Sequence, residues 1–566
     1  MAMPGAASRR VARPAPELTA PSLTVSYRSS VSTSLSDDTS RPAPTEPGAG
    51  ADRGTGGRAW SAVAVLVAAG VTVAAWLPFL HAPLGSDESG FLLLAQHWRP
   101  GSSLYGDYWV DRPPLLLWLF STADHLGPTR VTAAGVTAPG VKLLGAAASG
   151  AAVILAGILA NLVAPKAGWS RRAAIVLAAA LLSSPLFGMP ETDGEVLAVP
   201  FVLLGVLCLL AALRRPSGRR AMLLAFTAGG SATAAALVKQ NVIDVFVFAV
   251  VLAILSRGRV PGLGPRLAGF AGGATGVLAA AVAGAWVQGT TVAGLWDAIV
   301  VFRLQASGVI GSSASEATPA RMTGLIEAFG ASGAAAVLVV SGGVVLARVV
   351  RGRRPATQET VDPSLMPGPD LAWPVLAMVV WELCGVALGG SYWLHYLTGL
   401  VPGLVLMVAI ARPGRWSKRV LTLTVAYAAV ASLAVWGHDV ATPAGVSSDA
   451  QVMSYLREHA RPSDGVVVGF GHPDIVAGSE LHSPYEHLWS LPVRVRDPRL
   501  TELRLVMAGP SAPRWIVVAG DSLDTWGLEA DEAQQYLVRH YVEQVAYGDW
   551  HIWRRLGQRG GMEAVR

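Results

Sequence analysis

Two adjacent carboxylates, Asp87 and Glu88, follow directly after the first long apolar run of the sequence. A carboxylate near a membrane surface can act as a general base and take a proton from an incoming hydroxyl or amine. The same residues also suit the start of a helix, where Ser86 or Asp87 caps the first turn and an acid favours the positive end of the helix dipole. The residue types alone leave both interpretations open, and both place the pair at a helix N-terminus.

The elements that position this pair must lie in a membrane. Of the 566 residues, 52% are hydrophobic and only 14% are charged, whereas soluble domains carry about 25% charged residues. A helix needs about 20 apolar residues to cross the hydrocarbon core. The apolar runs of this sequence therefore predict about eleven transmembrane helices, at 60–80, 139–163, 173–189, 195–213, 221–238, 241–256, 267–287, 324–348, 371–389, 396–411 and 419–436.

The connections between these runs alternate in charge, because every second one is rich in Lys and Arg. The basic connections are 166–172, 214–220, 257–266, 348–354 and 412–419. Under the positive-inside rule they lie in the cytoplasm, so the N-terminus is cytoplasmic and residues 437–566 are extracytoplasmic. The formal net charge of +6 thus reflects membrane topology, and we expect no nucleic-acid partner. Cys208 and Cys384 lie inside apolar runs and indicate neither a disulfide framework nor a cysteine metal site.

The region before the first run and the loop after it differ from the apolar runs. Residues 1–57 are rich in Ser, Pro, Ala and Thr, which predicts a disordered cytoplasmic tail. The transmembrane domain then extends over 58–436, and its first outer loop covers 81–138. Within this loop, 86–98 (SDESGFLLLAQHW) and 111–127 (DRPPLLLWLFSTADHLG) carry short apolar stripes, which suit helices lying in the membrane interface.

The C-terminal residues 437–566 change character again. Their apolar residues are spaced as in short helices at 450–460 and 530–541 and in short buried strands at 465–470 and 515–520. This pattern predicts a small extracytoplasmic α/β domain on the outer face of the transmembrane part.

The first outer loop carries an ordered set of residues that resembles a known family. It consists of an acidic pair after the first span, a Tyr-x-Asp about twenty residues later, and a basic residue before Pro-Pro-Leu and an aromatic helix. In this sequence the set reads Asp87-Glu88, Tyr105-Gly106-Asp107, Asp111-Arg112-Pro113-Pro114-Leu115 and Trp118. It resembles the GT-C glycosyltransferases of the family-39-like group, which includes protein O-mannosyltransferases, the lipid A aminoarabinose transferase and many actinobacterial relatives. The resemblance continues at 181–204, at Lys239, at His395-Tyr396 and at Pro402, and it covers about residues 60–440.

The resemblance implies roles for the residues of the first loop. In that family the acid after the first span is the proposed catalytic base, and the basic residue before Pro-Pro-Leu contacts the lipid phosphate. Asp87 is accordingly the expected base, with Glu88 as its neighbour, and Arg112 is the expected phosphate contact. Many relatives have Lys where Arg112 stands. Arginine keeps the charge and offers a fork that matches phosphate oxygens, so the role survives although the geometry need not.

Further cations fit an anionic donor. Lys239, Arg303 and Arg321 are nearly the only cations expected on the outer side beyond the first loop, and a cation placed against the positive-inside bias indicates an anionic partner. A polyprenyl-phosphate headgroup is one such partner, and snorkelling or a surface ion pair is the alternative. His395 and Tyr396 could bind donor sugar or phosphate, or could belong to an interfacial aromatic belt.

Other polar residues have less defined roles. Glu191, Asp193 and Glu195, with Tyr105 and Asp107 of the first loop, are candidates for acceptor binding or secondary roles. The three acids at 191–195 could also bind a cation, although solvation of a loop explains most of them more simply. Glu382 lies inside the ninth run, where an ionisable residue is costly and usually functional or paired.

We therefore expect a polytopic α-helical membrane protein of GT-C-like fold that transfers a hexose or pentose from a polyprenyl-phosphate donor. The acceptor would be an extracytoplasmic glycan, lipid or protein. The alternatives are a membrane transporter or lipid-linked-sugar flippase, for which repeat symmetry and charges at the bilayer midplane are expected, or a catalytically silent relative that binds lipid-linked sugars. Apart from the lipid-linked donor no cofactor is expected with certainty, and the sequence leaves the need for a divalent metal open.

Overall fold

A computed structural model describes residues 53–557 except 166, 313–316, 352–369, 444 and 526, with only the backbone described at 53–61, 311–312 and 317. The predicted disordered tail at 1–57 therefore lies almost entirely outside the described residues. From Arg58 onward, the described residues form one compact unit.

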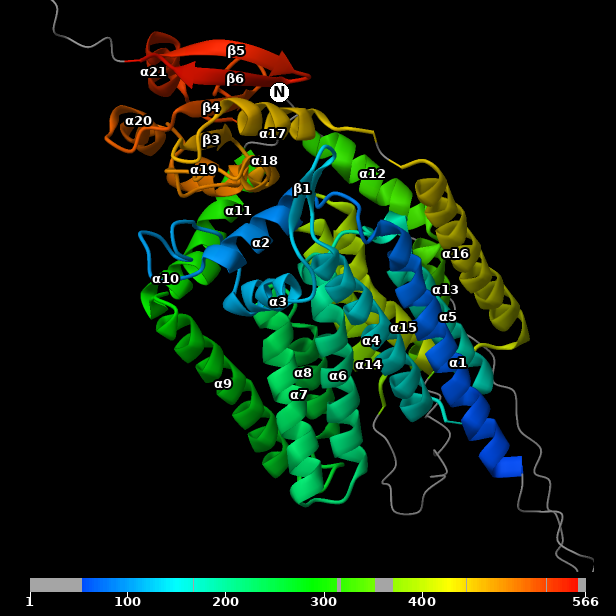
Figure 1. Cartoon of the computed structure of the whole chain (residues 1–566). Coiled ribbons are helices and arrows are strands. Elements are labelled where there is room, and N and C mark those ends of the chain that lie inside the picture. The colour runs from blue at the N-terminus through cyan, green and yellow to red at the C-terminus, as the bar shows by residue number, and fades with distance from the viewer. Residues whose placement is uncertain are drawn as a thin grey trace, which may run out of the picture. The chain divides into compact units, whose positions relative to one another are not determined.

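Most of this unit is a bundle of apolar helices (Figure 1). Its longer helices are α1 (Arg53–Trp76), α4 (Pro139–Val163), α5 (Gly168–Leu182), α6 (Gly194–Arg214), α7 (Arg219–Val238), α8 (Asp244–Ser256), α9 (Leu263–Val287), α12 (Ala317–Ala331), α13 (Ala334–Val350), α14 (Ala372–Ala387), α15 (Val401–Ile410) and α16 (Arg415–Ala441). Short turns of other helix types, η1 (Leu77–Phe79), η2 (Pro185–Phe187) and η4 (Leu394–Leu400), join or extend them.

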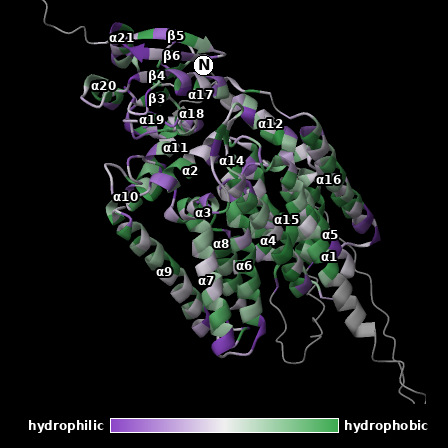
Figure 2. Ribbon diagram, viewed as in Figure 1, coloured by the Kyte–Doolittle hydropathy of each residue, from purple (hydrophilic) through white to green (hydrophobic). Residues whose placement is uncertain are grey.

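The helices in the middle of the bundle differ from those at its edge. In α4, α6 and α7, more than half of the stretch that could span a membrane is buried inside the protein. In α1, α9 and α16, less than a quarter of that stretch is buried. The edge helices expose large apolar side chains such as Leu66, Trp286 and Leu433. Figure 2 shows hydrophobic residues along most of the bundle. An apolar surface of this kind is stable in lipid and would be unstable in water.

Helices α7 and α9 pack closely because glycines face each other. A Cβ at Gly229 would collide with the backbone carbonyl of Phe270, and a Cβ at Gly273 would collide with that of Phe226. Small residues at such positions allow two helix backbones to approach closely, as is common in membrane proteins.

In the part of the chain that the structure describes, seven helices are long and apolar enough to cross a membrane. The helices α12 and α13 are bent by 63° relative to each other, and counting them together as one span raises this number to eight. Three shorter apolar helices, α8, α14 and Leu394–Ile410, match further predicted spans. The count of eleven spans stays a prediction.

Two details differ from the predicted segmentation. The run predicted at 173–189 is helical only to Leu182, because Ser184 precedes Pro185 and takes an extended backbone conformation. The segment 288–322, expected as an outer loop, contains α10 (Val292–Trp296), the π-helix η3 (Asp297–Val301) and α11 (Phe302–Ser312). Val292–Ile310 has the length and hydropathy of a span, but α11 packs against helix α19 of the C-terminal part.

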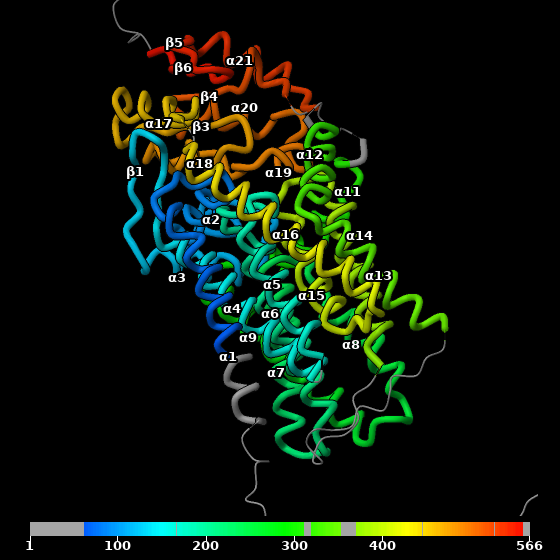
Figure 3. Tube along the Cα trace, turned by 90° about the vertical axis from the view of Figure 1, so that its right-hand side faces the viewer, coloured from blue at the N-terminus to red at the C-terminus, as the bar shows by residue number. Residues whose placement is uncertain are grey.

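The first loop forms the two helices expected from its apolar stripes. These are α2 (Ser86–His97) and α3 (Pro114–Asp124), followed by a hairpin of β1 (Arg130–Thr132) and β2 (Gly135–Thr137). In Figures 1 and 3, α2 and α3 lie between the helical bundle and the C-terminal part of the chain.

The described residues of 437–557 form the C-terminal part, which we call the tail domain. It contains a four-stranded sheet in the order β3-β4-β6-β5. β3 (Val466–Gly469) and β4 (Trp515–Ala519) are parallel, while β6 (Trp550–Arg555) runs antiparallel to both β4 and β5 (Tyr541–Tyr547). Its helices are α17 (Ser448–His459), α18 (Pro473–Ser479), α19 (Ser490–Arg496), α20 (Thr501–Ala508) and α21 (Asp531–His540). The helices and strands predicted here are thereby confirmed within one to two residues, while the helices α18, α19 and α20 and the hairpin β5–β6 were not predicted.

Candidate functional site

The start of α2 holds the acidic pair, and the two acids have different surroundings. Glu88 is buried and closes a capping box by accepting the backbone N–H of Gly85 at 2.9 Å. It also accepts the backbone N–H of Thr192 at 2.8 Å, and its two oxygens lie 2.8 and 2.7 Å from Nζ of Lys142. Asp87 is half-buried and accepts a hydrogen bond of 2.8 Å from the indole N–H of Trp489. The expectation that Ser86 or Asp87 caps the helix is wrong, because α2 already begins at Ser86 and its N-cap is Gly85, whose N–H is accepted by Glu88. Glu88 thus has structural partners on several sides, and Asp87 stays the candidate base.

Lys142 was missed by the sequence analysis. It lies in the first turn of α4, its side chain is 2% exposed, and it donates a further hydrogen bond of 2.9 Å to the carbonyl of Pro190. The available signal was the same as for Lys239, namely a cation at an end of an apolar run whose neighbouring loop is not basic. Buried Lys142 therefore joins α4, the start of α2 and the loop before α6.

The expected phosphate contact Arg112 lies beside a second arginine. Arg112 is 3.1 Å from one carboxylate oxygen of Asp111, and Arg303 forms an ion pair with the other oxygen. The carbonyl of Arg112 accepts the hydroxyl of buried Tyr105 at 2.6 Å, and the carbonyl of Asp111 accepts the side-chain amide of Gln240 at 2.9 Å. Two guanidinium groups share one carboxylate, so this cluster carries one positive charge in excess.

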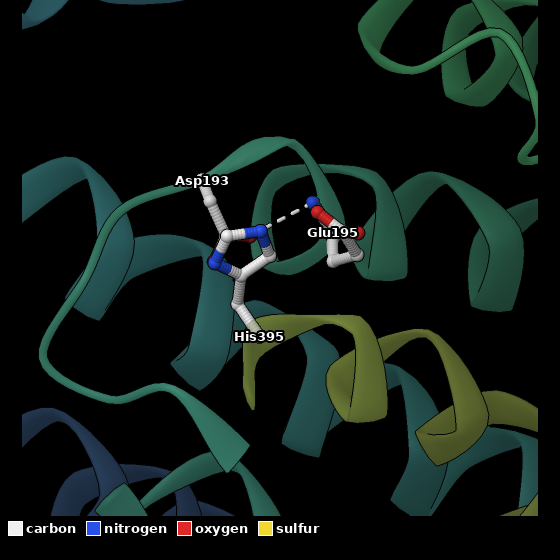
Figure 4. Close-up of side chains that lie close together, drawn as sticks. All are labelled: Asp193, Glu195 and His395. Carbon is white, nitrogen blue, oxygen red and sulfur yellow. Dashed lines mark hydrogen bonds and ion pairs between the residues drawn. The ribbon is translucent and has the colours of Figure 1, made fainter. Parts of the chain in front are cut away.

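Asp193, just before α6, and Glu195, in its first turn, lie around His395 (Figure 4), and Glu191 of the preceding loop lies beside the same ring. Asp193 is the N-cap of α6 and accepts the backbone N–H groups of Glu195 and Val196 at 2.9 and 3.1 Å. Nδ1 of His395 lies 3.5 Å from a carboxylate oxygen of Asp193 and 3.5 Å from one of Glu191. Burial raises the pKa of Asp193 to about 7, although the charge of His395 opposes this shift. Burial acts in the same direction on Glu191, but its hydrogen bond with His395 and the charge of that ring hold its pKa below the usual value.

Lys239 is paired as well. It follows the last residue of α7 and forms an ion pair with Glu195, and its ammonium group lies 4.6 Å from the ring centre of Tyr396. The methylene chain of Lys239 packs over Gly194, where a Cβ would come within 3.2 Å of it. The residues predicted to bind donor at Lys239, His395 and Tyr396 thus form one cluster with the acids predicted for secondary roles.

A divalent cation would find three possible ligands in this cluster. Asp193, Glu195 and His395 offer two carboxylate oxygens and an imidazole nitrogen within 4.8 Å of one another. Such a mixed set suits zinc or manganese. The ammonium group of Lys239 already neutralises Glu195, however, and would repel a dication at this distance. The three residues fit a metal only if Lys239 gives up its contact.

The remaining two predicted residues are Asp107 and Arg321. Asp107 is 3.8 Å from His482 of the tail domain and 3.4 Å from the hydroxyl of Ser102, and the structure does not bring it to Asp87 or Arg112. Arg321 lies over the ring of Trp393, 4.7 Å from its centre.

The buried Glu382 of α14, which had no named partner, has two neighbours. Its carboxylate accepts the backbone N–H of Gly403 at 2.9 Å, and it lies against the carboxyl group of Asp244 at the start of α8. These contacts join α14 to α8 and α15.

The tail domain reaches the start of α2 at several points. The hydroxyl of Ser86 donates to Asp474 at the start of α18, and His472 lies 2.9 Å from Asp449. Burial raises the pKa of Asp474 to about 6, against the charge of His472. Burial lowers the pKa of His472, but its hydrogen bond to Asp449 and the charge of Asp474 outweigh this effect and hold it above the usual value.

Comparisons with known proteins show the fold. No family model and no curated protein sequence matches the chain. The crystal structure of ArnT from Cupriavidus metallidurans in the apo state is 12% identical, with 88% of this chain covering 98% of that one at a TM-score of 0.51. This likeness confirms the expected fold class, a polytopic helical membrane protein with a small sheet domain.

Two other solved structures are similar at lower scores. ArnT from the same organism bound to undecaprenyl phosphate is 12% identical, with coverage of 89% and 99% and a TM-score of 0.49. The oligosaccharyltransferase AglB from Archaeoglobus fulgidus, in complex with an inhibitory peptide and a dolichol-phosphate, is 11% identical, with coverage of 89% and 75% and a TM-score of 0.47. The fold assignment rests on the apo structure alone.

Proposed function

We propose that this protein transfers a sugar from a polyprenyl-phosphate donor to an acceptor on the extracytoplasmic side of the membrane. The observation that carries the proposal is the placement of Asp87 at the end of the bundle that also holds the arginine pair Arg112 and Arg303. The guanidinium group of Arg112 lies 5.8 Å from the ring centre of Phe91, one turn after Asp87 in α2, so the proposed base and the proposed phosphate-binding cation lie near each other.

In the proposed reaction, Asp87 takes the proton of an acceptor hydroxyl as the acceptor oxygen bonds to the anomeric carbon. The bond between that carbon and the phosphate oxygen breaks, and the polyprenyl phosphate leaves with the bonding electrons. Arg112 and Arg303 stabilise the negative charge that develops on this phosphate. Their shared neighbour Asp111 holds them in place and neutralises only one of their two charges.

A lipid-linked donor suits the surroundings of this site better than a nucleotide sugar. The sequence contains no Gly-rich nucleotide loop and no Walker motif. The apolar helices below the site can solvate a polyprenyl chain. ArnT, whose apo structure has the same fold, has also been solved with undecaprenyl phosphate bound. That lipid phosphate is therefore the first ligand to test.

The residues of the cluster around His395 take supporting roles in the proposal. Lys239, His395 and Tyr396 line the donor side, with Lys239 held by Glu195. Glu191 and Asp193 orient His395. A metal ion has no step in this scheme.

We further propose that the N-terminus is cytoplasmic and that the tail domain is extracytoplasmic, as the alternation of basic connections predicts. Cysteine labelling from either side of the membrane tests this orientation. Residues 214–220 and 348–354 should be labelled from the inside, and 288–322 and 437–566 from the outside. Cytoplasmic labelling of the tail domain would contradict the proposed active-site face.

The substitution Asp87→Asn tests the proposed function directly. Asparagine has nearly the same shape and still accepts the hydrogen bond from Trp489, but it cannot take the proton. We expect turnover of a synthetic polyprenyl-phosphate sugar in nanodiscs to fall by about 10²–10⁴-fold, with binding of undecaprenyl phosphate unchanged. Asp107→Asn is the matched control, because Asp107 lies in the same loop but apart from the site. A normal rate for Asp87→Asn would refute the assignment of the base.

A further inference from the structure

The tail domain contacts the candidate base through one short segment, 482–496. Trp489, the residue before α19, donates its indole N–H to Oδ1 of Asp87 at 2.8 Å. In the same segment, the carbonyl of Glu486 accepts the backbone N–H of Trp109 at 3.0 Å. Arg496 of this segment lies 2.6 Å from Asp297 of η3. The segment therefore joins α2, the first loop and η3 beside the site.

From this geometry we infer that Trp489 is a positioning residue for Asp87, holding its carboxylate at the angle needed to meet an acceptor hydroxyl. The inference rests on the proposed function. It assigns the tail domain a part in the reaction itself, because the group that orients the base comes from this domain and not from the transmembrane helices.

The position of Trp489 is itself fixed by packing. Its ring stacks on Phe91 of α2, with 5.5 Å between ring centres and 25° between the planes. Gly90 makes room for it, because a Cβ there would come within 2.5 Å of the indole ring and 2.6 Å of the ring of Pro473. The indole N–H thus reaches Asp87 from a ring that cannot turn away without disturbing α2 and α18.

The two acids at the start of α2 are consequently held by different parts of the chain. Glu88 is fixed by Lys142 and Thr192, which belong to the transmembrane part, whereas Asp87 is fixed by the tail domain. A base must lie within hydrogen-bond reach of the proton that it takes. Small errors in the placement of a catalytic group can reduce the rate about 10²-fold.

The first test is Trp489→Phe, which keeps an aromatic ring against Phe91 and removes the N–H donor. We expect kcat to fall roughly tenfold to a hundredfold, as for loss of a hydrogen bond to a charged group, with KM for the donor little changed. The control is Trp515→Phe. Trp515 donates its indole N–H to Asp464 inside the tail domain at 3.2 Å, so the same change is made away from α2, and kcat should stay normal.

A double-mutant cycle separates positioning from a structural role. If Trp489 acts through Asp87, then Trp489→Phe should cause no further loss in an Asp87→Asn background. An equal loss in both backgrounds would overturn the inference and leave Trp489 as a packing residue. A normal rate for Trp489→Phe, with Asp87→Asn impaired, would also overturn it without touching the proposed function.

Two further outcomes are decisive. If Trp489→Phe fails to fold, β-(3-benzothienyl)alanine at this position keeps the shape of the indole without its N–H, and the same fall in kcat is expected. If the wild-type protein turns over neither a polyprenyl-phosphate hexose nor a pentose, or if Asp87→Asn is fully active, the proposed function fails and the role of Trp489 fails with it.

Discussion

Replacing Lys142 by Met should destabilise the protein strongly, because it leaves the carboxylate of Glu88 buried without a counter-charge. Both side chains are 2% exposed, and the ammonium group lies 2.7 and 2.8 Å from the two oxygens. Removing one partner of a buried ion pair typically costs about 3–5 kcal/mol. Glu88 would keep the backbone N–H groups of Gly85 and Thr192, so we expect a loss near the lower end, about 3 kcal/mol.

The companion variants distinguish a charge effect from lost packing. Glu88→Gln together with Lys142→Met removes both charges and keeps the shapes, so most of the stability should return. Lys418→Met is the matched control, because Lys418 is exposed, and it should change the stability by less than about 0.5 kcal/mol. Reversible unfolding in mixed micelles gives the free energy of unfolding of each variant.

One result would refute this reasoning. If Lys142→Met cost no more than Lys418→Met, Glu88 would not depend on Lys142 for its burial. The structural role of Glu88 would then lose its support, and Glu88 would return as a candidate base beside Asp87.

Three further predictions concern other parts of the molecule. Arg112→Ala should weaken binding of undecaprenyl phosphate in nanodiscs by about 1.5–3 kcal/mol, and Arg112→Lys should weaken it less because the charge remains; equal losses would point to a structural role. Gly403→Ala should lower the stability by about 1–3 kcal/mol because the new Cβ collides with the carboxylate of Glu382, whereas Gly399→Ala has room for its Cβ and should not. The raised pKa of His472 stabilises the fold below its unfolded pKa, and this contribution is lost as the pH rises through the folded value. The apparent Tm should therefore fall as the pH rises above about 6.5, the usual pKa of histidine, and His472→Gln should reduce that fall; an unchanged pH profile in the variant would contradict it.

The sequence predicted the parts of the fold that depend on local pattern. Apolar runs located the long helices, and short amphipathic or buried stretches located α17, β3, β4 and α21 in the tail domain. The strand β5 was missed because its residues Tyr541–Tyr547 are mostly exposed, so it lacks the apolar character of β3. The helix predicted at 173–189 ends earlier, at Leu182, because Pro185 disfavours a helical conformation of the residue before it.

The candidate site could be predicted only as a set of residues, since its pairings depend on distant contacts. Lys239 and Arg303 were identified as cations for an anionic ligand, yet each also has an acid beside it in the structure. Their partners, Glu195 and Asp111, are 44 and 192 positions away in the sequence. No local pattern shows which of several acids a cation will meet after folding. Trp489 was missed for the same reason, because it lies 402 positions from Asp87.

Helix geometry explains why two neighbouring acids of similar chemistry take different roles. Consecutive residues of an α-helix point about 100° apart, since about 3.6 residues complete a turn. Asp87 and Glu88 at the start of α2 therefore cannot both face the transmembrane part. Glu88 turns toward Lys142 and Thr192 and is buried, and this direction leaves Asp87 facing the tail domain, where Trp489 meets it. An exchange of the two acids would put the shorter carboxylate opposite Lys142 and the longer one beside the indole, so the order Asp-Glu determines which acid meets Lys142 and which meets Trp489.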